Sequence, residues 1–268
     1  MISFGLSPGC TMSFSNIHRD AAVGVALLGV SFAVGVYIGK KYFLFRSKKS
    51  QKIFEGQDDP RRVYLLRLSL REHPAAKKLR QQLFSITPRD VSSDAAQLLG
   101  NLAKLIKSRR VLDIGRSCGY NPLVLALVLP ADGKVTASFS ETENSSDAKE
   151  FWREAGVDNK IEIIVKSAEQ TLDDLLSAGE AGKFDLVFIN MADEQSCRKC
   201  YEKSLRLLRS GGILAIDGVL CYGAALKLNS KSVTVQAMHQ LSEAILRDAR
   251  IALSILPVGD GLMLCFKL

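Results

Sequence analysis

A chain of 268 residues is too long for a small disulfide-stapled module and long enough for one α/β domain with an additional segment. Its six cysteines show no framework spacing, so reduced thiols are expected. The formal net charge is +8, but seven Lys and Arg residues and a single Asp lie in residues 1–52, which leaves only +2 for the rest of the chain. A near-neutral domain argues against a nucleic-acid-binding protein, which needs a basic face.

The first expected element is a membrane helix. Residues 1–20 form an N-terminal tail, and residues 21–39 form an uncharged apolar run, close to the roughly 20 residues that a helix needs to cross a bilayer. A cleaved signal peptide is the alternative, but the run continues through Tyr37 into Lys40 and Lys41 instead of ending at a cleavage site. An uncleaved, single-pass transmembrane helix is therefore predicted. Lys and Arg are more numerous after the run, which predicts that the C-terminal domain faces the cytoplasm or the mitochondrial matrix.

A polar, basic segment separates this helix from the domain. Residues 40–62 predict a juxtamembrane linker, and the domain is expected to cover residues 63–268. Apolar residues recur at helical spacing from 63 to 83, and Pro74 interrupts them, which predicts two lead-in helices. Ser93 and Asp94 are the expected N-cap of the next helix.

Strands and helices then alternate along the chain. We expect strands at residues 110–115, 134–139, 161–166, 184–190, 212–217, 251–257 and 262–268, and helices at residues 121–129, 146–155, 171–178, 195–208 and 233–249. This alternation predicts an α/β domain with a seven-stranded, mostly parallel sheet covered by helices on both faces. Residues 258–261 (VGDG) are typical of a hairpin turn, so the sheet should end in a C-terminal antiparallel hairpin.

The first strand of the alternating series runs directly into a glycine-bearing turn. In VLDIGRSCGY (residues 111–120), Gly115 and Gly119 would let the backbone come close to a ligand at the carboxyl end of the strand. The same kind of turn also occurs in doubly wound domains that bind no ligand. Asp113 would lie at the mouth of the site, where it suits an ammonium or a ribose hydroxyl, or it would cap the turn.

Several stretches of the domain together carry a family resemblance. They are REHP (71–74), SSDAAQLLGNLAKLI (92–106), RRVLDIG (109–115), CGYNPLVLALVLPADGKV (118–135), FDLVFIN (184–190), LLRSGGILAID (207–217) and LPVGDGLMLCFKL (256–268). With them, residues 63–268 resemble the cation-dependent O-methyltransferases of the catechol and caffeoyl-CoA type.

This resemblance implies a fold, a reaction and partners. The expected fold is a Rossmann-like class I S-adenosylmethionine methyltransferase. The family moves a methyl group from S-adenosylmethionine to a phenolic oxygen held against a divalent cation, usually Mg²⁺. The acceptor would be a small, catechol-like molecule with a hydroxyl group. Members of the family often pair, so a homodimer is expected.

The resemblance also places the cofactor site. The implied cofactor-binding positions are Val91, Asp113, Gly115, Ser117, Gly119, Tyr120, Asn121, Phe139, Glu141, Ala168 and Asn190. Two of them depart from the family pattern. Asn121 replaces the usual Ser, and Phe139 occupies the position of the acid that pairs with both ribose hydroxyls. Glu141, two residues further on, is the candidate substitute for that acid, although it would lie roughly 7 Å away along a strand.

The metal site departs further from the family. The family's D-A-D-K reads N-M-A-D here, so Asn190 takes the place of a ligand Asp and Asp193 takes the catalytic position of the Lys. The Asp-Asn pair after the fifth strand reads Asp217-Gly218. Asn190 and Asp217 are thus the expected metal positions, and they predict a weak Mg²⁺ site. Asp193 would either move in as a compensating ligand or cap the helix that follows.

These substitutions leave two readings of the function open, and a third reading is disfavoured. The chain is either an active, membrane-anchored O-methyltransferase with altered metal dependence, or a catalytically impaired pseudo-methyltransferase that acts as a binding or scaffold module. An NAD-dependent oxidoreductase is disfavoured because the first turn lacks G-x-G-x-x-G and the second strand ends without a ribose-binding acid.

Overall fold

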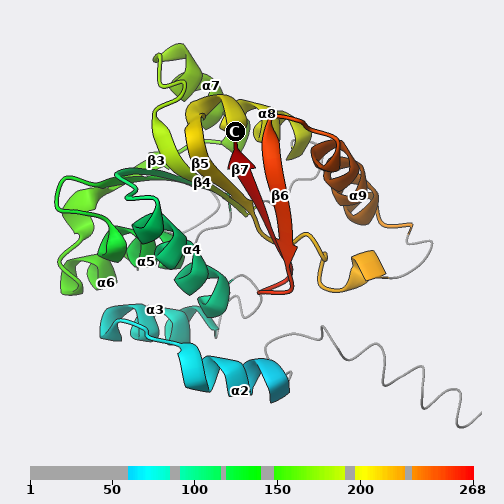
Figure 1. Ribbon diagram of the computed structural model, residues 1–268. Coiled ribbons are helices and arrows are strands. Elements are labelled where there is room, and N and C mark those ends of the chain that lie inside the picture. Colours follow the sequence, from blue (N-terminus) through cyan, green and yellow to red (C-terminus); the bar gives the residue numbers. More distant parts are fainter. Residues whose placement is uncertain (1–59, 85–90, 116–118, 140–147, 191–196, 227–230) are drawn as a thin grey trace, which may run out of the picture. The chain divides into compact units, whose positions relative to one another are not determined.

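The computed structural model describes residues 60–84, 91–115, 119–139, 148–190, 197–226 and 231–268 (Figure 1). The predicted tail, transmembrane helix and most of the linker lie outside these residues. No helix within the described ranges is both long and apolar enough to cross a membrane.

Three helices precede the sheet, namely α2 (Pro60–Ser69), α3 (Pro74–Phe84) and α4 (Ser93–Leu105). The two lead-in helices were predicted, and Pro74 opens α3, where a missing N–H is harmless. α2 begins at Pro60, within the last residues of the predicted linker. The predicted cap of α4 was wrong: Ser92 is the N-cap, without a side-chain capping bond, and Ser93 and Asp94 lie in the first helical turn.

The strands form one sheet in the order β3-β2-β1-β4-β5-β7-β6. They are β1 (Arg110–Gly115), β2 (Lys134–Phe139), β3 (Ile161–Val165), β4 (Phe184–Asn190), β5 (Leu208–Ile216), β6 (Ile251–Leu256) and β7 (Leu262–Lys267). The first five are parallel, whereas β7 runs antiparallel to both β5 and β6. The predicted seven-stranded, mostly parallel sheet with an antiparallel C-terminal hairpin is confirmed.

Helices cover both faces of the sheet (Figure 1). The remaining helices are α5 (Tyr120–Val128), α6 (Ala148–Glu154), α7 (Ala168–Ser177), α8 (Cys197–Leu207) and α9 (Val233–Leu246), with short 3₁₀ turns at Asp158–Lys160 and Ala224–Leu226. One apolar core lies between the sheet and α3 to α6, and a second lies between the sheet and α7 to α9. Strands buried on both faces carry near-continuous apolar runs, as FDLVFIN of β4 shows.

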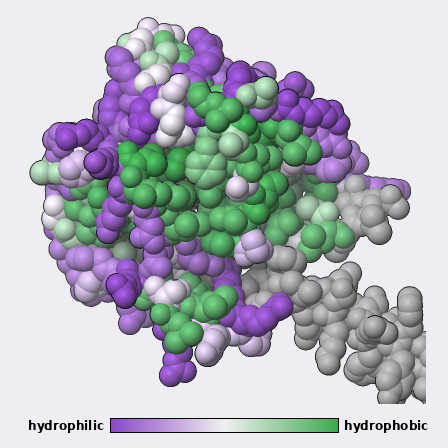
Figure 2. Space-filling model, in the orientation of Figure 1, coloured by the Kyte–Doolittle hydropathy of each residue, from purple (hydrophilic) through white to green (hydrophobic). Residues whose placement is uncertain are grey.

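The surface in this view is not uniformly polar. Hydrophobic residues gather over the region where β5, β7 and β6 lie, beside the helices α4 and α5, and hydrophilic residues surround them (Figure 2).

Candidate functional site

The candidate site lies at the edge of the sheet where the parallel strands end. β1 lies between β2 and β4, so the order of the strands along the chain reverses between β1 and β4. In open α/β sheets, the crevice outside such a reversal is where ligands bind. Gly115 and Asn190, the last residues of β1 and β4, pair with each other at this point. The sheet therefore brings two of the predicted cofactor positions together at the expected place.

The two glycines of the turn are required by backbone packing. Gly115 has φ +114°, and a Cβ there would lie 1.9 Å from the carbonyl oxygen of Asn190. Gly119 has φ +81°, and a Cβ there would lie 2.2 Å from the Cβ of Ala148 in α6. The indole Nε1 of Trp152 donates a hydrogen bond to the Gly119 oxygen at 2.9 Å. These contacts with β4 and α6 fix the end of β1 and the start of α5.

The start of α5 offers donors to an anionic group. Gly119 is its N-cap, in a left-handed conformation and without a side-chain capping bond. The N–H groups of Tyr120 and Asn121 have no acceptor within the helix, whereas Pro122 has no N–H and the Leu123 N–H already donates to the Gly119 oxygen. The helix dipole favours negative charge at this end. Asn121 lies in this first turn and is buried. These groups fit the carboxylate of the methionine part of S-adenosylmethionine, the cofactor implied by the resemblance.

Tyr120 connects α5 to the lead-in segment. Its hydroxyl donates to Oε1 of Glu72 at 2.6 Å, and the Glu72 carboxylate also accepts two hydrogen bonds from Arg80 at 2.8 Å. Burial and the Glu72 carboxylate raise the pKa of Tyr120 far above its ordinary value, so the hydroxyl stays protonated. Tyr120 therefore acts in this structure as a link between α5 and the residues before α3.

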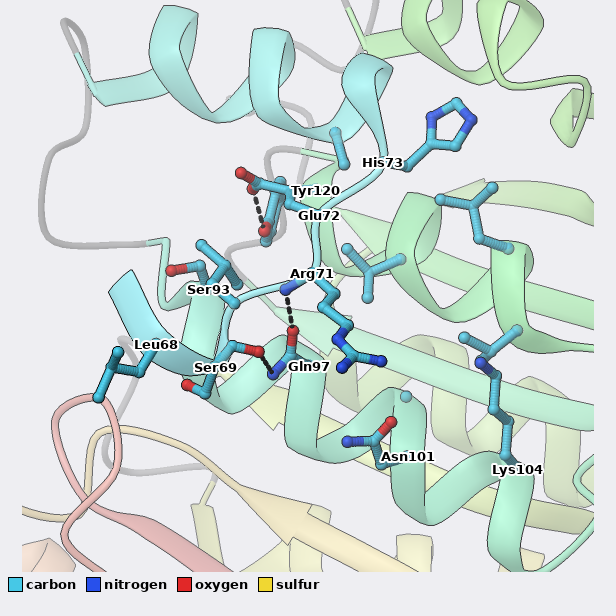
Figure 3. Close-up of a pocket in the computed structure, with 16 residues that line it drawn as sticks. Leu68, Ser69, Arg71, Glu72, His73, Ser93, Gln97, Asn101, Lys104 and Tyr120 are labelled. Atoms are coloured by element: carbon cyan, nitrogen blue, oxygen red, sulfur yellow. Dashed lines mark hydrogen bonds between the residues drawn. The ribbon is translucent and has the colours of Figure 1, made fainter. Parts of the chain in front are cut away.

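A cavity of about 690 Å³ lies beside this link, between residues 70–73 and the helices α4 and α5 (Figure 3). The Gln97 side chain spans one side of it, since it donates to the Ser69 oxygen at 3.0 Å and accepts from the Arg71 N–H at 2.6 Å. Tyr120 is the one predicted cofactor position in its lining. The cavity is thus a neighbour of the predicted cofactor site.

Two further cofactor positions are buried in the sheet. Asp113 was expected at the mouth of the site, but it lies within β1 with 0% of its surface exposed. Phe139, at the end of β2, is 1% exposed and belongs to the core beneath α4 to α6. A phenylalanine side chain has no hydrogen-bond acceptor for ribose hydroxyls, so Phe139 cannot take the role of the family's acid.

Of the remaining predicted cofactor and catalytic positions, the structure describes Val91 and Ala168. Val91 is buried just before α4 and packs into the same core. Ala168 is the first residue of α7, whose N-cap Ser167 accepts from the N–H of Gln170 at 3.3 Å. Ser117, Glu141 and Asp193 lie outside the described residues.

The two predicted metal positions are neighbours in the sheet. Asn190 ends β4, and Asp217 follows directly after β5, where its N–H donates to the Ile189 oxygen at 2.9 Å. The carboxylate Oδ1 of Asp217 accepts from the Gly218 N–H at 2.9 Å. The carboxyl edge of the sheet therefore presents one carboxamide and one carboxylate side by side.

Residues from three other segments of the chain lie around Asp217. The β6–β7 turn closes over it, because a Cβ on Gly259 would lie 3.3 Å from Oδ1 of Asp217 and 2.7 Å from Oγ of Ser92. Arg62 of α2 donates to Asp94 at 2.6 and 2.9 Å and to Ser92 at 3.2 Å. Asp260 follows Gly259 in the turn, and its charge acts on Asp217. Residue type gave no signal for this cluster, since its members come from four distant segments.

The electrostatics of this cluster depend on burial. Burial, reinforced by the carboxylates of Asp260 and Asp94, raises the pKa of Asp217 to about 7, although the Gly218 N–H and Arg62 act in the opposite direction. Burial also raises the pKa of Asp260. For Asp94 burial works in the same direction, but hydrogen bonds from Arg62 and a neighbouring serine bring its pKa below the ordinary value.

The described residues do not fit Mg²⁺. This ion prefers several oxygen ligands with negative charge. Asn190 supplies no charge, Gly218 supplies no side chain, and Asp94 is already paired with Arg62. The described part of the chain contains no group of three or more His, Cys, Asp or Glu residues arranged to hold a metal.

Comparison with known proteins agrees with this architecture. A family model described as O-methyltransferase matches residues 67–268. Catechol O-methyltransferase domain-containing protein 1 of Mus musculus is 42% identical over 255 residues, which cover 94% of this chain and 97% of that protein. A probable caffeoyl-CoA O-methyltransferase 2 of Dictyostelium discoideum is 38% identical over 168 residues, covering 62% and 72%. The solved structure of the O-methyltransferase TomG from Streptomyces achromogenes, in complex with S-adenosylmethionine, has a TM-score of 0.67 and 28% identity, covering 76% and 94%.

Proposed function

Because the chain belongs to the O-methyltransferase family, we propose that its domain transfers a methyl group from S-adenosylmethionine to a hydroxyl of a small acceptor. The observation that carries this proposal is that Gly115, at the end of β1, and Gly119, at the N-cap of α5, lie where the strand order reverses between β1 and β4. That place in the sheet suits a ligand, and the N-terminal end of α5 suits an anionic group.

Each residue at the carboxyl edge of the sheet has its own role in the proposed reaction. When bound, S-adenosylmethionine supplies an electrophilic methyl group on its sulfonium. The first turn of α5, with Asn121, would hold the cofactor carboxylate, and Asn190 would contribute its carboxamide at the crevice. Asp217 would accept the hydrogen bond of the acceptor hydroxyl, orient its oxygen and take up its proton as the oxygen–methyl bond forms, the methyl–sulfur bond breaks and S-adenosylhomocysteine leaves. Orientation of two reactants in one site is a large part of the rate gain in a transfer reaction.

The acceptor is proposed to be a catechol-like molecule. The names of the relatives support this class, since they include a catechol O-methyltransferase domain-containing protein and caffeoyl-CoA O-methyltransferases. A screen of catechols and simple alcohols with radiolabelled S-adenosylmethionine tests it: transfer to alcohols alone would contradict the proposed class.

Attachment to a membrane and pairing are further parts of the proposal. Residues 21–39 would anchor the chain, with residues 1–20 as a tail and residues 40–62 as a linker, and residues 63–268 facing the cytoplasm or the mitochondrial matrix. Protease protection of tags at both chain ends tests this orientation.

The hydrophobic surface near β5, β7 and β6 supports a homodimer (Figure 2). Light scattering that gives the mass of one chain would contradict pairing.

A pseudo-methyltransferase that binds ligands or partners at the membrane is the second candidate. Burial of Phe139 in the core favours it, because the ribose of the cofactor loses its acidic partner there. The two candidates differ in turnover: cofactor binding with transfer supports the enzyme, and binding without transfer to any acceptor supports the second candidate.

A charge variant tests the cofactor site in both cases. Asn121→Asp places a negative charge where the cofactor carboxylate would bind, and it should weaken S-adenosylmethionine binding about tenfold, equivalent to about 1.4 kcal/mol. An Asp in the first turn suits the helix dipole, but Asn121 is buried, so thermal unfolding is measured in parallel to show that the variant folds. Asn159→Asp, at an exposed position in the 3₁₀ turn before β3, is the control and should leave binding unchanged in calorimetric titration. Equal affinities for both variants would place the cofactor elsewhere.

A further inference from the structure

We infer that Arg62 supplies, from within the chain, the positive charge that a divalent cation would bring to the acidic end of β5, so that this site works without a metal. The inference deepens the proposed function and rests on it for the position of the acceptor. It assigns a positioning role to a residue that no sequence motif marks.

The first observation is the geometry of the Arg62 ion pair. Two nitrogens of its guanidinium contact both oxygens of the Asp94 carboxylate, at 2.6 and 2.9 Å. The side chains are only 19% and 22% exposed, and a third hydrogen bond joins Arg62 to Ser92. A two-pronged, largely shielded pair of this kind is held more firmly than a surface ion pair. Arg62 is therefore a fixed charge at the start of α4.

The second observation is that this charge serves more than one carboxylate. Ser92 and Asp217 both approach the same point of the β6–β7 turn, at Gly259. Arg62 also interacts electrostatically with Asp217 and with Asp260. One guanidinium thus lies close enough to favour the charged form of carboxylates from α4, the end of β5 and the β6–β7 turn, although burial outweighs it at Asp217 and Asp260.

The third observation is that the oxygens of Asp94 are already used. Oδ1 accepts from Arg62, from Ser92 at 2.5 Å and from the Ala95 N–H at 3.1 Å, while Oδ2 accepts from Arg62. A divalent cation would have to displace the guanidinium or bind next to it against charge repulsion. Because Asn190 has no charge to offset that repulsion, the described residues favour the internal cation.

The test compares Arg62→Gln with Arg67→Gln, a control that removes the same charge from an exposed position of the same helix. The full chain in detergent is stripped with EDTA and titrated with Mn²⁺, and free Mn²⁺ is followed by electron paramagnetic resonance. Wild type and Arg67→Gln should bind no Mn²⁺ at this site. Arg62→Gln exposes the carboxylates, so its affinity for Mn²⁺ should be at least about tenfold above the upper limit that the wild-type titration sets. Arg62→Lys keeps the charge and should behave like wild type.

The possible outcomes separate the two claims. Stoichiometric Mn²⁺ binding by wild type, or equal binding by wild type and Arg62→Gln, would overturn the role of Arg62. Thermal unfolding shows whether Arg62→Gln is folded; should it not fold, the wild-type and Arg62→Lys titrations still decide. S-adenosylmethionine binding is measured in parallel by calorimetry. A wild type that binds neither ligand contradicts the proposed function while agreeing with the internal cation.

Discussion

Replacement of Glu72 by alanine should destabilise the domain by about 3 kcal/mol. The Glu72 side chain is only 6% exposed and accepts hydrogen bonds from Arg80 and Tyr120. The buried Tyr120 hydroxyl would lose its acceptor, at about 1 to 3 kcal/mol. Arg80 is 26% exposed and can recruit water, so its loss is smaller, about 1 kcal/mol. For a domain of this size the sum corresponds to a decrease in Tm of about 6 to 12 °C.

The assay is thermal and urea unfolding followed by circular dichroism, with Glu154→Ala as the matched control. Glu154 of α6 forms an ion pair with Lys78 of α3 at 2.7 Å, so it too links two helices, but both side chains are largely exposed. Its removal should change the free energy of unfolding by less than about 0.5 kcal/mol. Equal losses for the two variants would refute the argument that burial makes the Glu72 link strong. Tyr120→Phe should produce part of the Glu72→Ala effect, and the double variant should be less than additive.

Three further predictions concern packing and titration. Gly115→Ala should prevent folding, because its Cβ would overlap the neighbouring strand. In Gly182→Ala the Cβ meets no atom, so the free energy of unfolding should fall by only about 1 kcal/mol, owing to the left-handed φ. Comparable soluble yields of the two variants would contradict this. Burial, with a nearby carboxylate, raises the pKa of Cys265 to about 12, so iodoacetamide should modify it at pH 8 only after unfolding, as mass spectrometry would show. Burial opposes ionisation of Asp185, but hydrogen bonds from Arg209 and two backbone N–H groups hold its pKa below the ordinary value. This stabilisation is present at neutral pH and is lost as the pH falls below about 4, so Asp185→Asn should show a flatter acid dependence of unfolding; parallel curves would contradict it.

Much of the fold could be predicted because its signals are local. Near-continuous apolar runs mark strands buried on both faces, and helical spacing between them marks the covering helices, so every strand was predicted. The ends of the strands and helices were predicted less accurately than their presence. β5 begins at Leu208, four residues before the predicted start at Gly212, since pairing with β4 extends it across a register shift. The N-cap of α4 is Ser92 and not the predicted Ser93 or Asp94, because two serines and an aspartate follow one another there and each residue type favours an N-cap.

The site was predictable where one short segment carries it. The turn around Gly115 and Gly119 was found, and the sheet places it beside Asn190 as the carboxyl ends of parallel strands require. Contacts between distant segments could not be found in this way. The Arg62–Asp94 pair joins residues 32 positions apart, and Tyr120 and Glu72 are 48 apart. Nothing in an isolated arginine or glutamate indicates which buried partner it will meet.

The protein is proposed to be a methyltransferase that uses S-adenosylmethionine and needs no divalent cation. The most direct measurement is calorimetric titration of the full chain in detergent with S-adenosylmethionine, in EDTA and in Mg²⁺, followed by radiolabelled transfer to a catechol under both conditions. We predict the same affinity and the same transfer with and without Mg²⁺. No cofactor binding in either condition, or transfer that EDTA abolishes, would contradict the account.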